Sequence, residues 1–167
     1  GNVNQYKKWC DEYDGIGASK IIPLWDGVNT VKVSILSASN GVATQELIDE
    51  FQEYLDPNTT GMGDGVAPIG AFVTVSTATE VPINISAKIV MKSGYTDTNI
   101  IDTALSDYLK SIAYEKNQVS YLNLGACILN TEGVESVSEL VINGGTSDIL
   151  IDNEEIGVLG VTDWTVV

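Results

Sequence analysis

The chain has 167 residues, 44% of them hydrophobic and 19% charged, which is a globular composition with room for one ordinary domain or two small ones. It carries 23 acidic residues against eight lysines, has no arginine or histidine, and has a formal net charge of −15. The negative field disfavours nucleic-acid binding, and the missing histidine excludes Ser-His-Asp and Cys-His catalysis and His-ligated zinc. Neither a membrane-spanning apolar run nor a signal peptide is visible in the sequence.

The first half of the chain begins with a short helix and a hairpin. Aromatic and apolar residues recur at helical spacing over Tyr6–Tyr13, and Asp14-Gly15 is expected to end that helix. The turn residues Asp26–Asn29 lie between two apolar runs, Ile16–Trp25 and Val31–Ile35. We therefore expect an antiparallel hairpin here.

A second helix and a third strand complete this half. Thr44 is expected to cap the helix and Pro57 to end it. Its expected buried face comprises Leu47, Ile48, Phe51, Tyr54 and Leu55. The glycine-rich loop Asp56–Gly65 then crosses the surface to a strand at Ala71–Val75.

We place a domain boundary within Ser76–Glu80 and predict two domains, residues 1–78 and 79–167. Beyond the boundary, Ile83–Met91 alternates apolar and polar residues as a half-buried strand does. Thr96 is expected to cap the helix that follows. The apolar face of that helix comprises Ile101, Leu105, Tyr108, Leu109 and Ile112.

Two internal echoes relate the halves to each other. A strand, a polar turn and a helix beginning at Val31 recur from Ile85, an offset of 54 residues. A second stretch, beginning at Asp14, recurs from Glu132, an offset of 118 residues. The repeated positions are turn and core residues without reactive groups, which is more typical of a scaffold than of an enzyme.

The second echo also decides an ambiguous segment, Tyr121–Leu129. The alternation of apolar and polar residues in this segment fits a strand, but its apolar residues also form a helical stripe behind a possible cap at Ser120. The echo aligns the segment with the first helix of the chain and therefore favours a helix. Two strands are expected after it, at Ser136–Asn143 and Ile149–Ile151, around a turn at Gly144-Gly145. Val158–Val167 is a candidate for one further strand.

These elements predict an α+β fold made of two small α/β sandwich domains. The first has the order α-β-β-α-β, and the second has the order β-α-α-β-β, a cyclic reordering of the first. Each domain is expected to hold a mostly antiparallel sheet with helices on one face.

Three segments carry patterns that also occur in binding or catalytic sites. Gly61–Gly65 lacks the preceding strand, the following helix and the lysine of a phosphate cradle, so we interpret it as a surface crossover. Asp56–Asp64 resembles the first nine positions of a calcium loop, with oxygen-bearing side chains at positions 1, 3, 5 and 9 and glycine at 6, but Ala67 stands at position 12, where the bidentate carboxylate belongs. The third segment is an acidic turn with Asp148, Asp152, Glu154 and Glu155. Nothing around this turn suggests the dry cleft of a glycosidase. From the three segments together we expect no catalytic, cofactor-binding or metal-binding residue.

The cysteines and tryptophans leave alternatives open. Cys10 and Cys127 lack CxxC spacing and are interpreted as buried free thiols, a disulfide between them being the alternative. Trp9 fits the stripe of the first helix. Trp25 and Trp164 are candidates either for the core or for exposed interface anchors.

Several strings in turns and core strands carry a family likeness. They include Ile-Ile-Pro-Leu-Trp-Asp-Gly at 21–27, Gly-Val-Ala-Pro-Ile-Gly-Ala-Phe-Val-Thr-Val at 65–75 and Val-Ile-Asn-Gly-Gly-Thr at 141–146. Together they resemble the baseplate J family of contractile-tailed phages, prophages and phage-like particles. The likeness covers nearly the whole chain but only the C-terminal part of a typical member. The chain does not start with Met, so we expect it to be a piece of a longer protein.

The resemblance implies a structural wedge subunit of a baseplate, present in several copies and bound to other wedge and tail proteins. It implies a place in a virion or tail-like particle assembled in the bacterial cytoplasm, without enzymatic activity or a cofactor. The residues alone leave one alternative open, a non-catalytic ligand- or calcium-binding surface module.

Overall fold

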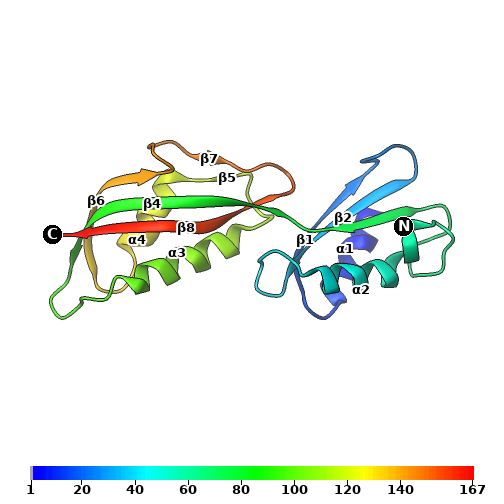
Figure 1. The fold of residues 1–167 in the computed structure, drawn as a ribbon, viewed down its shortest axis with the longest axis horizontal. Helices are drawn as coiled ribbons and strands as arrows, with labels where there is room; N and C mark the ends of the chain where they lie inside the picture. Colours follow the sequence, from blue (N-terminus) through cyan, green and yellow to red (C-terminus); the bar gives the residue numbers. More distant parts are fainter. Residues whose placement is uncertain (1) are drawn as a thin grey trace. The chain divides into compact units, whose positions relative to one another are not determined.

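The computed structural model describes residues 2–167 and divides the chain into two compact units, Gly1–Thr79 and Glu80–Val167 (Figure 1). Each unit has its own cluster of buried apolar side chains. Within residues 2–167, no helix has the length and apolar character needed to cross a membrane.

The first unit has the predicted order of helices and strands. It consists of α1 (Val3–Glu12), β1 (Ile16–Pro23), β2 (Thr30–Ser37), α2 (Gln45–Leu55), the 3-10 turn η1 (Pro57–Thr59) and β3 (Phe72–Ser76). The sheet order is β1-β2-β3, with β1 antiparallel and β3 parallel to the central strand β2. The predicted hairpin is thus confirmed, and the parallel third strand makes the sheet mixed.

Both helices of this unit pack on one face of its sheet. Tyr6 and Cys10 of α1, Phe51 and Leu55 of α2, and alternate residues of β2 and β3 share one buried cluster. Thr44 caps α2 as predicted, its hydroxyl accepting a hydrogen bond from the Leu47 N–H at 3.2 Å.

The predicted buried face of α2 is wrong at one position. Tyr54 is exposed, with its ring 5.2 Å from that of Tyr13 and 5.7 Å from that of Phe51. The aromatic contacts therefore hold Tyr54 at the margin of the core.

The second unit contains three long strands, two helices and two very short strands. They are β4 (Thr79–Met91), α3 (Asn99–Ile112), β5 (Gln118–Val119), α4 (Tyr121–Leu129), β6 (Val134–Ile142), β7 (Ile149–Leu150) and β8 (Glu155–Val166). The main sheet has the order β6-β4-β8, and β6 is antiparallel to β4. The strand β8 runs in the same direction as β4 (Figure 1). Accordingly, the Val161 N–H reaches the Asn84 side chain, and the Val167 N–H reaches the Ile89 carbonyl farther along β4.

The ambiguous segment is a helix, as the echo predicted. α4 starts after Ser120, whose hydroxyl accepts from the Asn123 N–H at 3.2 Å. The predicted Thr96 cap of α3 is wrong: the N-cap is Thr98, which makes no side-chain cap hydrogen bond. Instead, the Asp97 carboxylate accepts from the Asn99 N–H at 2.9 Å, because a charged acceptor next to the first turn suits the helix dipole.

The expected strand at Ile149–Ile151 exists but has a different partner. β7 pairs antiparallel with β5, which the sequence did not predict, in a separate two-stranded sheet. The chain after β6 therefore leaves the main sheet and returns to it only with β8.

Buried residues of the two units correspond at both predicted offsets. At 54 residues the buried pairs are Val33 with Ala87, Ile35 with Ile89, Phe51 with Leu105, and Leu55 with Leu109. At 118 residues they are Tyr6 with Leu124 and Cys10 with Ile128. Each main sheet also has an antiparallel neighbour on one side of its central strand and a parallel neighbour on the other. The two units therefore share one arrangement of helices and strands. In the first unit the pair α1–β1 precedes the pair β2–α2, whereas in the second unit the strand–helix pair β4–α3 precedes the helix–strand pair α4–β6.

Candidate functional site

Exposed apolar side chains gather around the turn between β1 and β2 and around the loop that leads into β3. Leu24 and Val28 in the turn are 66% and 82% exposed, and Ile69 in the loop is 84% exposed. An isolated exposed apolar side chain needs no explanation, whereas several around one hollow are typical of an interaction site.

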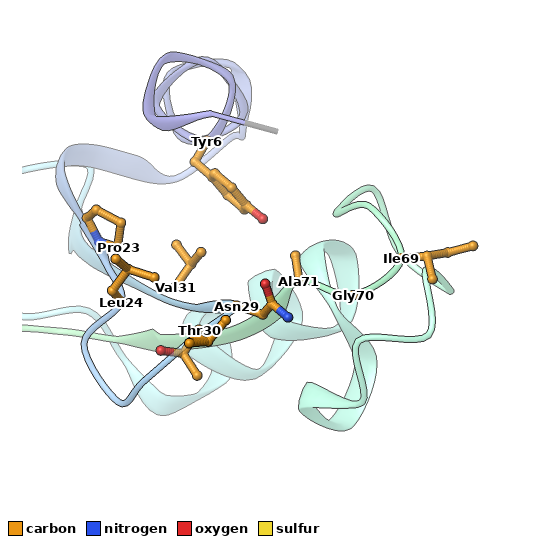
Figure 2. A pocket seen from close by; sticks show the side chains of 10 residues that line it. Tyr6, Pro23, Leu24, Asn29, Thr30, Val31, Ile69, Gly70 and Ala71 are labelled. Carbon is orange, nitrogen blue, oxygen red and sulfur yellow. The ribbon is translucent and has the colours of Figure 1, made fainter.

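These side chains surround a hollow of about 450 Å³. Pro23, Leu24, Thr30 and Val31 line it from the hairpin, and Ile69–Ala71 lines it from the loop (Figure 2). Tyr6 reaches into it from α1 with the hydroxyl directed toward the side of Asn29 and Ala71, while Ile69 points outward at the far rim (Figure 2). The hollow is thus lined by apolar side chains together with the polar side chains of Tyr6, Asn29 and Thr30.

Hydrogen bonds fix the hairpin side of the hollow. The Leu24 N–H donates to the Thr30 carbonyl at 2.7 Å, and the Thr30 hydroxyl donates to the Gly27 carbonyl at 2.7 Å. Leu24 and Asn29 have φ angles of 58° and 67°, and Gly27 has a φ of 104°. Val28 therefore lies in a turn that is held by these hydrogen bonds and by residues in the left-handed backbone conformation.

The loop side is fixed by a buried carboxylate, Asp56, which is 2% exposed. Its oxygens accept from the Gly61 N–H and the Val73 N–H, each at 3.0 Å. The Gly70 N–H donates to the Gly61 carbonyl at 2.8 Å, and the Phe72 N–H donates to the Asn29 carbonyl at 2.9 Å. The last bond joins the loop directly to the hairpin, so the two walls of the hollow are hydrogen-bonded to each other.

The Tyr6 hydroxyl is a buried polar group without a hydrogen-bond partner among residues 2–167. Tyr6 is 3% exposed, and its ring meets that of Trp9 edge-on at 5.2 Å. Burial, followed by the nearby Asp56 carboxylate, raises the pKa of the Tyr6 hydroxyl above its usual value. The hydroxyl is therefore protonated at neutral pH and can donate a hydrogen bond.

The glycine-rich loop has a structural role that the sequence did not indicate. Asp56, the first residue of the calcium-like pattern, directs its carboxylate to backbone N–H groups of the loop and of β3. In the part of the chain that the structure describes, no group of three or more His, Cys, Asp or Glu side chains is placed to hold a metal ion.

The acidic segment of the second unit is partly used in local caps. The Asp148 carboxylate accepts from the Tyr121 N–H at 2.8 Å, at the start of α4. The Glu155 carboxylate accepts from the Asp152 N–H at 2.9 Å. These acids therefore secure the ends of neighbouring elements.

The structure shows the surroundings of both cysteines and of Trp25 and Trp164. Cys10 and Cys127 are both free thiols, Cys10 fully buried and Cys127 partly buried. Trp164 packs on the core of the second unit, and its indole N–H donates to the Asp102 carboxylate at 2.8 Å. Trp25 is 41% exposed, with the Lys32 ammonium 4.2 Å from its ring centre. Of the two open cases, Trp164 is thus partly buried against the core and Trp25 is a surface residue.

Comparison with protein families gives two matches in sequence order. Residues 1–77 match the baseplate J-like central domain, and residues 83–165 match the baseplate J-like protein C-terminal domain. The chain belongs to the baseplate J-like family. The resemblance carried by the turn and strand strings is thereby confirmed.

Two curated relatives of this baseplate J-like chain come from Bacillus subtilis strain 168. They are the phage-like element PBSX protein XkdT and the uncharacterized protein YqbT, and each is 33% identical over 162 residues, covering 95% of this chain and 46% of the relative. The chain thus spans about half the length of these relatives.

A solved structure shows the same fold. The anti-feeding prophage baseplate, determined by cryo-electron microscopy with 6-fold symmetry, contains a chain that matches with a TM-score of 0.62. The match has 13% identity and covers 97% of this chain and 37% of that one.

Sequence reasoning missed the hollow of this baseplate J-like chain, although it had marked its turn. Val28 lies between Gly27 and Asn29, and Ile69 lies between Pro68 and Gly70. An apolar residue between two turn formers was the available signal, because such a residue lies at a loop tip where the core cannot cover it.

Proposed function

We propose that this chain is part of a structural wedge subunit of a contractile-tail baseplate and that it works through protein–protein contacts. The observation that carries the proposal is the ordered match of both baseplate J-like domains over residues 1–77 and 83–165. The subunit would be present in several copies and bound to other wedge and tail proteins, in a virion or tail-like particle assembled in the bacterial cytoplasm.

The distribution of reactive side chains supports a role without catalysis. The chain has no histidine and no arginine. Asp56, Asp148 and Glu155 direct their carboxylates to backbone N–H groups, as structural carboxylates do. The net charge of −15 further favours protein partners over nucleic acid.

Deletion of the gene in a strain that produces the particles tests the proposal. We expect the deletion to abolish complete baseplates in electron micrographs, and the full-length gene supplied in trans to restore them. Normal baseplates without this protein would refute a structural role. A deletion strain carrying the gene for an unrelated acidic protein controls for expression load.

A further inference from the structure

We propose that the outer edge of β8, over Val161–Val166, receives an extended segment of a different tail protein as an additional strand. This inference rests on the proposed function for the statement that the partner belongs to the same particle. It adds which part of this chain binds the partner and in which conformation the partner binds.

The two main sheets have four outer edges, formed by β1, β3, β6 and β8. An edge strand exposes a row of unpaired main-chain N–H and C=O groups. Proteins usually interrupt such a row with bulges, prolines or charges, or cover it with other groups. An edge without these features is open to a strand from another chain.

Both edges of the first unit carry such features. The register of β1 shifts near its start, and the Lys7 ammonium donates to the main-chain carbonyl of Ser19 in this strand. On β3, the Gln52 side chain bonds to the Val73 carbonyl and to the Val75 N–H. The edges of the first sheet are therefore protected against strand addition.

The two edges of the second main sheet differ from each other. The pairing of β6 with β4 shifts register twice, and β6 carries the exposed acids Glu135 and Glu139. Over Val161–Val166, in contrast, β8 has one charged residue, Asp163, and no proline. Valine, threonine and tryptophan make up the rest of this stretch and favour a strand. Among residues 2–167, β4 is the one strand that pairs with β8.

The hydrogen bonds of β8 show which of its main-chain groups face outward. The Val161 N–H donates to the Asn84 side chain of β4, and the Val167 N–H donates to the Ile89 carbonyl of β4. Odd-numbered residues of this stretch therefore face β4, and even-numbered residues face away from it, because alternate residues of a strand direct their main-chain groups to opposite sides. The outward groups are those of Thr162, Trp164 and Val166.

A comparison of β8 with β3 explains why this edge is open. Both are the parallel neighbours of a central strand, and each packs beside the helix that follows that strand. At the offset of 54 residues, Gln52 of α2 corresponds to Ser106 of α3, whose side chain is too short to reach over a strand edge. The Asp102 carboxylate of α3 accepts instead from the side chains of Thr162 and Trp164. Thus α3 holds β8 by its side chains, whereas α2 holds β3 by its main chain.

The chemistry of the edge determines its occupant. A row of main-chain donors and acceptors is complemented by another extended main chain, which pairs with it by β-augmentation. Residues 80–167 contain 13 acids and four lysines, so a second copy would bring two strongly negative units together. We therefore assign the edge to a segment of a different protein that carries no net negative charge.

Photo-crosslinking in assembled particles tests the site. The photoreactive residue p-benzoyl-phenylalanine replaces Val161, which is 73% exposed, or Thr165, which is also exposed. Leu122 on α4, 77% exposed, is labelled as the control. We expect Val161 and Thr165 to crosslink to one segment of another tail protein, at residues about four apart, because paired strands advance in step. Crosslinks to a second copy or to unrelated segments would overturn the proposal, as would none in particles that contain the labelled protein.

Hydrogen exchange distinguishes strand addition from other modes of docking. The crosslinked segment is made as a synthetic peptide and added to the full-length protein. The amides of Thr162, Trp164 and Val166 should exchange roughly tenfold more slowly or better in its presence, because they become paired. The amides of Asp163 and Thr165, which face β4, are the internal control and should change little. Unchanged exchange of the outward amides would refute pairing at this edge.

A proline in the edge tests the same bonds by affinity. Val166→Pro removes an N–H that lies outside the β4 ladder, so the circular dichroism spectrum should be kept while the affinity for the peptide falls roughly tenfold or more. Val166→Ala keeps the N–H and should bind within about threefold of wild type. Equal affinities of the two variants would overturn the proposal. Failure of strand addition is distinguishable from failure of the proposed function, because the deletion strain reports on baseplate assembly independently.

Discussion

The side-chain amide of Gln52 donates a hydrogen bond to the main-chain carbonyl of Val73 at 2.8 Å. The same amide accepts from the Val75 N–H at 2.8 Å, and the Asp56 carboxylate accepts from the Val73 N–H at 3.0 Å. Side chains at the end of α2 therefore take the place of a further strand along the outer edge of β3. This closes an edge that would otherwise be open to strand addition.

Replacement of Gln52 by alanine is expected to destabilise the first unit by about 2–3 kcal/mol, because three main-chain hydrogen bonds are lost at roughly 0.5–1.5 kcal/mol each. The third of these bonds is the one Gln52 donates to the Asp56 carbonyl at 2.7 Å. Urea denaturation measures the loss, and light scattering measures the association that an exposed β3 edge would cause. Gln45→Ala is the matched control, since Gln45 makes one exposed contact with Asp49. Equal stability of the two variants would contradict the prediction.

Removal of the Asp102 carboxylate is expected to loosen β8 from α3. This carboxylate accepts from the Trp164 indole at 2.8 Å and from the Thr162 hydroxyl at 3.1 Å. Asp102→Ala should lower the free energy of unfolding of the second unit by about 1–3 kcal/mol and change the fluorescence of Trp164. Asp107→Ala, at an exposed position of the same helix, is the control. A double-mutant cycle with Trp164→Phe should show coupling, and strictly additive effects would contradict it.

The long elements could be predicted from the sequence because each has a strong period and a clear stop. The echoes also predicted shared core positions, since Phe51 and Leu105 are buried at the offset of 54 residues. The short strand β5 was not predicted, and β7 was predicted without its partner, because two residues carry no periodicity and their pairing depends on the tertiary fold.

The candidate site was harder to predict from the sequence than the fold. The hollow depends on the Phe72 N–H reaching the Asn29 carbonyl, a contact across more than 40 residues that no local pattern encodes. The orphaned hydroxyl of Tyr6 was hidden in an ordinary helical stripe, because burial of an aromatic ring predicts nothing about its polar tip. The donors to the Asp56 carboxylate could likewise not be predicted, since they are backbone N–H groups, which almost every residue type carries.

Burial raises the pKa of the Cys10 thiol to about 11 from an ordinary value of 9.0. The thiol ionises first in the unfolded chain, so between pH 9 and 11 the unfolded state binds fewer protons than the folded state. The contribution of Cys10 to stability is therefore complete below pH 9 and is lost as the pH rises toward 11, by up to about 1.4 kcal/mol per pH unit. Urea denaturation at several pH values should give a shallower alkaline decline for Cys10→Ala than for wild type. Identical slopes would show that the thiol does not titrate differently on unfolding.

The proposed domains, residues 1–78 and 79–167, are expected to fold as separate fragments. Each buried cluster draws its residues from one unit, with the first ending at Val75 and the second beginning with Val81 packed beside Ile83. A cut at this point breaks neither sheet, although cores of this size leave each fragment only marginally stable. Dispersed amide spectra of both fragments, with melting temperatures within a few degrees of those in the whole chain, are the expected result. A fragment of residues 1–66 is the control: it lacks β3 and with it Val73 and Val75, so it should be unfolded. If 1–78 were as disordered as 1–66, the boundary would be wrong, because the first sheet would then require residues of the second unit.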